Sequence, residues 1–254
     1  MATWEMYDDL IEAVPADSVV VDCVAGLHWC VIRSEAVGLA MAPREGRGMI
    51  RHAGHIAGMK TREVAGWIKS WNLHEAALGL AAINSAINVP AKVERSWNVD
   101  LGLQEDQDVF ARLLDRLDGK KVAVIGHFRE LERVARVCHL SILERLPEQG
   151  DLPDPACEYI LPEQDFVFIT GTTLINKTLP RLLELSRGSQ VIVAGPSTPL
   201  APVLLKYGVT VLGGLVVDDA ERITRDVKEG AHHTLFGPGA KMVQVPPATV
   251  AHAV

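Results

Sequence analysis

The second half of the chain alternates short apolar runs with amphipathic stretches. The apolar runs are rich in Val, Ile and Leu, which is typical of buried strands. These runs lie at 121–125, 140–143, 166–169, 190–194 and 209–212. Helices are expected around them, at 107–118, 129–137, 178–187, 199–207 and 218–229. Because strands and helices alternate, this half is predicted to be an α/β, Rossmann-like domain with a parallel sheet.

The first half has a different order, with strands before helices. A short amphipathic helix at 5–13 precedes three β-rich runs, which are joined by short turns that predict antiparallel hairpins. The runs lie at 18–25, 28–33 and 37–40, a loop is expected at 42–58, and helices at 61–70 and 73–88. This order predicts an α+β unit. We expect a connector at 89–106 and place the domain boundary near Pro90, which gives domains 1–92 and 93–254.

The helix expected at 73–88 carries polar residues that need an explanation. Asn72 can cap its first turn, and Glu75 lies three residues further on, as in a capping box. Asn84 falls on the apolar stripe of the same helix, so its amide is expected to be buried or to face the other domain.

Four polar loops follow the apolar runs of the second half. In a parallel sheet such loops open on one edge, which is where open α/β folds bind ligands. The candidate ligand-binding residues in these loops are Gly126, His127, Phe128, Glu144, Arg145, Thr170, Gly171, Thr172, Thr173, Asn176, Gly195, Pro196, Ser197 and Thr198.

The first two loops are compatible with a bound nucleotide but carry no motif that is specific for one. Gly126 allows the backbone to turn tightly near a ligand, but a single glycine is not the dinucleotide fingerprint. Glu144 ends the next run, where a carboxylate often accepts hydrogen bonds from a ribose. The alternative is a surface glutamate paired with Arg145.

The other two loops are rich in hydroxyl groups. We expect a helix to start near Thr178, which leaves the polar stretch 170–176 with N–H groups suited to a carboxylate or a phosphate. The alternative is local capping of a buried turn. In the last loop, Ser197 or Thr198 is expected to cap a helix whose first residue is Pro199, so that the positive end of the helix dipole faces the crevice.

Several histidines are candidate metal ligands. His127 stands at a strand end, where a neutral imidazole can bind a metal or transfer a proton, although a structural role is equally consistent with the sequence. The pairs His52 with His55 and His232 with His233 lack any recognised metal-binding framework, and solvated loop residues are the favoured interpretation.

Composition narrows the classes of partner. The net charge of −7 and the lack of Lys or Arg runs argue against nucleic acid and anionic membranes as partners. No secretory signal pattern and no apolar run of about 20 residues is found, so a cytoplasmic protein is expected. The four cysteines form no C-x-x-C pair and are interpreted as reduced, buried thiols, with a thiolate metal site as the alternative.

Several longer motifs resemble those of the putative heavy-metal chelation family. The stretches WNLHEA at 71–76 and GLAAIN at 79–84 are similar to its N-terminal domain. The stretches GHF at 126–128, LER at 143–145, TGTTLIN at 170–176 and GPSTP at 195–199 are similar to its C-terminal domain. The resemblance implies an enolase N-terminal-like domain followed by a Rossmann-like domain, with a site in the cleft between them. It also implies that Asn72, Glu75 and Asn84 reach that cleft.

Two functions from different classes remain open. The first is a protein that binds a small molecule or metal complex between its domains, with His127 and Glu75 as the expected ligands of a transition metal. The alternative is a transferase or lyase that uses a nucleotide or S-adenosylmethionine, held by Gly126 and Glu144. The Ala-rich helix at 73–88 also suits close packing against a second copy of the chain.

Overall fold

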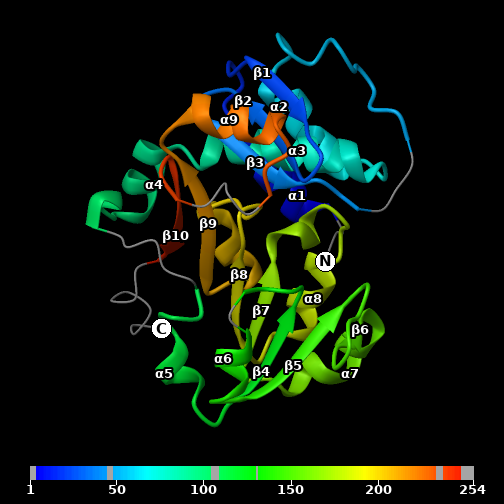
Figure 1. The fold of residues 1–254 in the computed structure, drawn as a ribbon, viewed down its shortest axis with the longest axis vertical. Coiled ribbons are helices and arrows are strands. Elements are labelled where there is room, and N and C mark those ends of the chain that lie inside the picture. The colour runs from blue at the N-terminus through cyan, green and yellow to red at the C-terminus, as the bar shows by residue number, and fades with distance from the viewer. Residues whose placement is uncertain (1–3, 45–47, 104–108, 130, 233–236, 247–254) are drawn as a thin grey trace.

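Two separate β-sheets organise the chain (Figure 1). The structure is a computed structural model, which describes residues 4–44, 48–103, 109–129, 131–232 and 237–246. The smaller sheet is antiparallel in the order β1-β2-β3, which confirms the predicted hairpins. Its strands are β1 (Asp22–Ala25), β2 (Trp29–Arg33) and β3 (Val37–Met41).

Helix α3 (Leu73–Ile87) packs closely on this small sheet. Almost all of its residues are buried. Small alanine and glycine side chains on several of its sides let neighbouring segments pack closely against each of those sides. The closest approach is at Gly38, where an added Cβ would lie 2.1 Å from the carbonyl oxygen of Ala81. The other helices of this half are α1 (Glu5–Glu12), α2 (Thr61–Ala65) and the 3-10 helix Gly66–Lys69.

The larger sheet has seven strands in the order β10-β9-β8-β7-β4-β5-β6. Every pairing in it is parallel except that of β10 with β9. Its strands are β4 (Lys121–Ile125), β5 (His139–Glu144), β6 (Leu152–Pro153), β7 (Phe166–Thr170), β8 (Gln190–Ala194), β9 (Val211–Val217) and β10 (Ala240–Val245). From β4 the chain first proceeds to β5 and β6 on one side, and then returns to β7 on the other. The strand order therefore reverses between β4 and β7, which is the switch point of a doubly wound sheet.

Short helices connect these strands. The α-helices are α5 (Leu114–Leu117), α6 (Leu131–Ala135), α7 (Cys157–Ile160), α8 (Leu179–Leu185) and α9 (Ala220–Lys228). The 3-10 helices are Leu101–Leu103, Asp154–Ala156, Leu161–Glu163, Gly171–Leu174 and Pro202–Tyr207. The helix expected at 107–118 is reduced to α5 among the described residues, and its first two positions lie outside them.

Helix α4 and strand β9 also differ from the expectation, and strands β6 and β10 were not predicted. Helix α4 (Pro90–Trp97) occupies part of the predicted connector, because Pro90 stands at the start of a helix, where it needs no N–H partner. The predicted domain boundary falls inside this helix. The strand expected at 209–212 continues through Gly213 and Gly214 to Val217. All of β10 pairs with this strand, β9.

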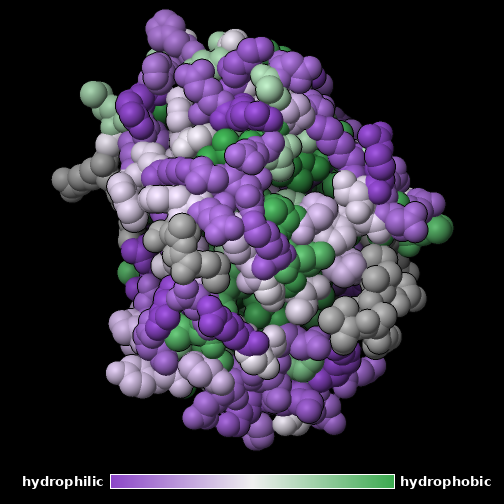
Figure 2. Space-filling view, turned by 180° about the vertical axis from the view of Figure 1, so that it is seen from behind, coloured by the Kyte–Doolittle hydropathy of each residue, from purple (hydrophilic) through white to green (hydrophobic). Residues whose placement is uncertain are grey.

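Apolar residues fill the space between the elements. Figure 2 shows that the face seen from behind is mainly hydrophilic above and below, whereas hydrophobic residues gather across its middle. Among the described residues no single helix has the length and apolar character needed to cross a membrane. Helices α3 and α4 reach that length and apolar character only when they are taken together, and the chain bends by 70° between them.

Candidate functional site

The carboxyl ends of the parallel strands bring the predicted loops to one edge of the large sheet. Strands β5, β4, β7 and β8 are neighbours in that order, so the loops at Glu144, Gly126, Thr170 and Gly195 follow one another along this edge. Gly126 adopts a φ of +100°, and a Cβ there would lie 2.9 Å from Cγ2 of Thr170. The two loops of the switch point therefore touch, and glycine is needed both for the turn and for the contact.

His127 follows β4 and is oriented by a carboxylate. Its side chain is 45% exposed, and its Nδ1 lies 3.5 Å from Oδ2 of Asp151, whose side chain is only 4% exposed. The same oxygen of Asp151 accepts a hydrogen bond from the backbone N–H of Glu148. The carboxylate is thereby held in place and faces one ring nitrogen of His127, which leaves Nε2 as the nitrogen that can meet a ligand.

A hollow of about 490 Å³ begins at His127 and continues along α6. We call it the α6 hollow; its lining residues are His127, Phe128, Leu131, Glu132, Arg133 and Arg136. Phe128 forms its apolar side, because its ring packs edge-on against Phe110 at 5.6 Å between centroids. Sequence reasoning missed the two arginines and Asp151, since none of them lies in a strand-end motif.

Glu144 ends β5 as expected. Its Oε2 accepts a hydrogen bond from the backbone N–H of Arg145, and the side chain of Arg145 lies 3.6 Å from Asp154. These contacts are local to the strand end. The ribose-binding role of Glu144 stays a prediction.

The threonine loop after β7 is closed by its own hydroxyls. Thr170 caps the 3-10 helix Gly171–Leu174, and its Oγ1 lies 3.1 Å from Oγ1 of Thr172. Thr173 donates to the carbonyl of Thr170, and Oδ1 of Asn176 accepts from both N–H and Oγ1 of Thr178. The contacts present are those of a capped turn, and α8 begins directly after Thr178 as predicted.

The loop after β8 does not start a helix at Pro199, and that expectation is wrong. The next helix begins at Pro202, so Ser197 and Thr198 cap nothing and no helix dipole starts at Pro199. Instead, Oγ of Ser197 accepts a hydrogen bond from the N–H of Met41 at the end of β3. The loop is therefore bonded to the first half of the chain.

Two asparagines of the α3 region also hold this loop. Asn84 is buried, as predicted, and donates to the carbonyls of Leu39 and Ser197. Asn88, the residue that ends α3, donates to the carbonyls of Thr198 and Leu215 and accepts from the N–H of Leu200. We call these contacts the asparagine clamp. Asn88 was not a sequence candidate, although a polar residue one turn after Asn84 was a usable signal.

Gly171 and Thr198 form a close contact within this region. A Cβ on Gly171 would lie 2.6 Å from Oγ1 of Thr198 and 2.8 Å from its backbone nitrogen. Oγ1 of Thr198 and Oδ1 of Asn84 are both buried without a hydrogen-bond partner among the described residues. Tight packing thus explains why residue 171 is a glycine. Gly195 and Pro196, at the start of the loop after β8, are half-buried.

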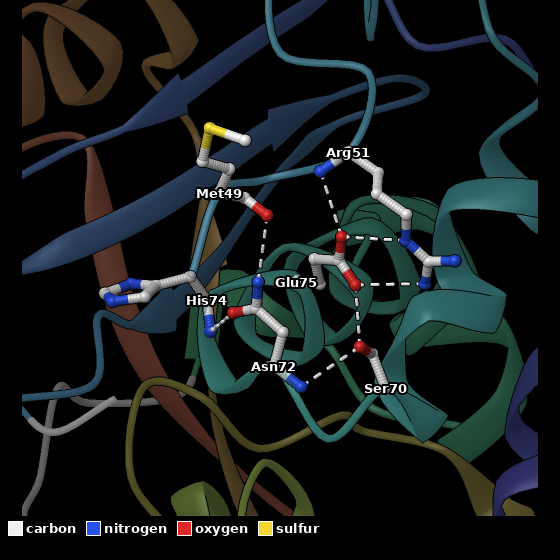
Figure 3. A network of polar contacts seen from close by, with 6 residues as sticks. All are labelled: Met49, Arg51, Ser70, Asn72, His74 and Glu75. Carbon is white, nitrogen blue, oxygen red and sulfur yellow. Dashed lines mark hydrogen bonds and ion pairs between the residues drawn. The ribbon is translucent and has the colours of Figure 1, made fainter. Parts of the chain in front are cut away.

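Glu75 is the centre of a polar network at the start of α3 (Figure 3). Its Oε1 accepts from the backbone N–H and Nε of Arg51, and its Oε2 accepts from Nη2 of Arg51 and from Oγ of Ser70. Asn72 caps the helix by accepting from the N–H of His74, as predicted. The reciprocal contact of the capping box runs through Ser70, which accepts from the N–H of Asn72.

Both oxygens of the predicted metal ligand Glu75 are therefore engaged. The bidentate guanidinium of Arg51 is the main reason that the pKa of Glu75 falls to about 2 from its usual 4.5, against the opposing effect of burial. The carboxylate binds the N–H of Arg51, and the amide of Asn72 donates to the carbonyl of Met49. Together they tie the loop that contains residues 48–55 to the start of α3.

Replacing Glu75 by glutamine is expected to remove a pH-dependent contribution to stability. A lowered pKa stabilises the fold fully above pH 4.5, and this stabilisation is lost as the pH falls towards 2. Because Arg51 is largely exposed, we expect a loss of about 2 kcal/mol at pH 7, which disappears near pH 2. Urea unfolding over this pH range measures the effect, with the exposed Glu63→Gln as control. If the stability difference between Glu75→Gln and the wild type were the same at pH 7 and near pH 2, this prediction would be contradicted.

Neither of the candidate histidine pairs lines the α6 hollow as far as the structure describes them. His52 and His55 line a second hollow, of about 660 Å³, together with His74 and residues 48–50. His52 also stacks on Trp67 at 5.9 Å between ring centroids. His232 packs against His28, and His233 lies outside the described residues. Within the described ranges, no three His, Cys, Asp or Glu side chains come together in a way that could hold a metal ion.

Comparison with known proteins places the chain in a family. Two family models, both described as "Putative heavy-metal chelation", match residues 7–87 and 108–246. The second covers more than half of the chain. The chain belongs to this family.

Relatives of the family share the fold over nearly the whole chain. A crystal structure from Desulfitobacterium hafniense, titled as a protein of unknown function from the DUF364 family, has a TM-score of 0.88 and 41% identity, and covers 96% of this chain and 98% of its own. A second family structure, from Pyrococcus horikoshii, has a TM-score of 0.80 at 23% identity, covers 96% of this chain and 99% of its own, and shows the fold alone.

One curated relative is also similar in sequence. An uncharacterized protein of Methanocaldococcus jannaschii is 30% identical over 68% of this chain, and the match spans 66% of that relative's length. The comparisons give no support to the nucleotide- or S-adenosylmethionine-dependent alternative. They agree with the predicted resemblance and with its two-part α/β fold.

Proposed function

We propose that the protein binds a metal chelate at the carboxyl edge of the large sheet, with the metal on Nε2 of His127. The observation that carries this proposal is the pairing of an exposed imidazole with a buried, held carboxylate, Asp151. Metal-ligating histidines commonly turn their other ring nitrogen towards such a partner, which fixes the ring and makes it a better ligand. The family description of heavy-metal chelation points to the same class of ligand.

A single imidazole supplies one ligand, so in this proposal the other ligands come from the chelating molecule. The touching loops at Gly126 and Thr170 form the floor of the switch point, beside His127. The first half of the chain forms the wall on the side of β8, through its bonds to Ser197. Glu75 serves here to hold the loop at 48–55, since its oxygens are bonded to Arg51 and Ser70.

Replacing His127 by alanine is expected to weaken binding of the nickel–nitrilotriacetate complex about 100-fold, because the only protein ligand to the metal is lost. Asp151→Asn should weaken it about tenfold through loss of ring orientation. Isothermal titration calorimetry measures both. The control is His139→Ala, which removes an exposed imidazole at the amino end of the neighbouring strand β5. Equal binding by wild type and His127→Ala would refute the proposal.

A further inference from the structure

The α6 hollow carries two cations on one side. Arg133 belongs to α6 and Arg136 follows its last residue, so the two are three positions apart and project from the same face. Both are exposed, whereas Leu131, which also lines the hollow, is buried. The lining of the hollow thus combines two guanidinium groups, the apolar side chains of Phe128 and Leu131, and His127.

Neither guanidinium has an ion pair or hydrogen bond to any residue that the structure describes. By contrast, Arg51 and Arg181 bind carboxylates through two nitrogens each. Glu132 also lines the hollow, one turn before Arg136, but no ion pair joins these two described side chains. Among the described residues that line the hollow, two arginines face one carboxylate, although the whole chain carries a net charge of −7. The carboxylate of Asp151 lies behind His127, against its Nδ1.

We infer that Arg133 and Arg136 form an anion subsite for the carboxylate groups of the bound chelate. This inference rests on the proposed function, because a metal on His127 fixes the chelate at a residue that lines the hollow. Guanidinium groups bind carboxylates in a planar, two-bond geometry, and a pair of them favours a ligand with several carboxylates. The ligand class is therefore a polycarboxylate chelator rather than a neutral or cationic one.

The decisive experiment compares three proteins in binding nickel–nitrilotriacetate and metal-free citrate. These are the wild type, Arg133→Gln/Arg136→Gln, and the control Arg187→Gln/Arg225→Gln. The control removes two exposed arginines that line neither hollow, so the change in net charge is the same. We expect the first double variant to bind both probes at least about tenfold more weakly and to lose most of the salt dependence of binding. The control should bind as the wild type does.

Each result has a separate meaning. Wild-type affinity in Arg133→Gln/Arg136→Gln, or an equal loss in the control, overturns the subsite. If this variant loses citrate binding while His127→Ala keeps full nickel–nitrilotriacetate affinity, the subsite stands and the proposed metal function fails. If only His127→Ala weakens binding, the function stands and the subsite fails. Displacement by inorganic phosphate more readily than by citrate would overturn the assignment to carboxylates.

Discussion

Replacing Gly38 by alanine is expected to prevent folding or to lower the free energy of unfolding by about 4 kcal/mol or more. The new Cβ would lie 2.1 Å both from the carbonyl oxygen of Ala81 and from the backbone nitrogen of Ser85. These are backbone atoms of α3, so they cannot rotate aside, and the helix would have to move away from β3. Any such movement also displaces Asn84 and Asn88.

The effect of Gly38→Ala is measured by soluble yield and by thermal unfolding. The matched control is Gly66→Ala, because Gly66 has a φ of −57° and open space where its Cβ would lie. Alanine at that position should leave stability unchanged or raise it by about 0.5 kcal/mol. If both variants melt within about 2 °C of the wild type, α3 does not pack on β3 as described.

Replacing Asn88 by aspartate is expected to destabilise the protein by about 3 kcal/mol at neutral pH, which corresponds to about 10 °C in Tm for a chain of this size. The side chain keeps its shape, but both donors are lost, and a carboxylate then faces the carbonyl oxygens of Thr198 and Leu215. Since Asn88 is 1% exposed, water cannot compensate.

The sign of the pH dependence tests this explanation. Burial against two carbonyls raises the pKa of an aspartate at position 88, because the neutral acid can still donate one hydrogen bond. The variant should therefore lose less stability relative to the wild type at pH 5 than at pH 8. The exposed Asn98→Asp is the control. A deficit that is equal at both pH values would show that charge at this position is not the cause.

Much of the fold could be predicted because periodicity and turn residues act locally. Strands β4 and β8 begin and end at the predicted residues, and α8 begins one residue after Thr178, where Pro180 requires a first turn. The end of β9 was missed because Gly213 and Gly214 resemble a turn. Their real reason is tertiary: a Cβ on Gly214 would lie 2.6 Å from the carbonyl oxygen of Thr198.

The sequence predicted where the candidate residues lie on the sheet, but not which side chains they contact. Parallel strands dictate that Gly126, His127 and Thr170 share an edge, whatever the rest of the chain does. The partner of His127 comes from the Pro-rich segment before β6, where Asp151 has no periodic signal. Similarly, Arg51 reaches Glu75 from a loop without regular structure. Such long-range polar contacts depend on tertiary geometry that spacing alone does not encode.

The asparagine clamp has a consequence for how this scaffold can change over time. In the loop after β8, Asn84 and Asn88 bind the main-chain carbonyls of Ser197 and Thr198 and the main-chain N–H of Leu200. Every amino acid provides such a carbonyl, and every one except proline provides the N–H. The side chains of Thr198 and Leu200 are themselves buried, whereas Pro196 is only half-buried. A substitution at Pro196 can therefore alter what this loop displays without removing the bonds that dock the two halves. During evolution, the side chains that this loop exposes can therefore change independently of the bonds that hold the loop to the first half of the chain.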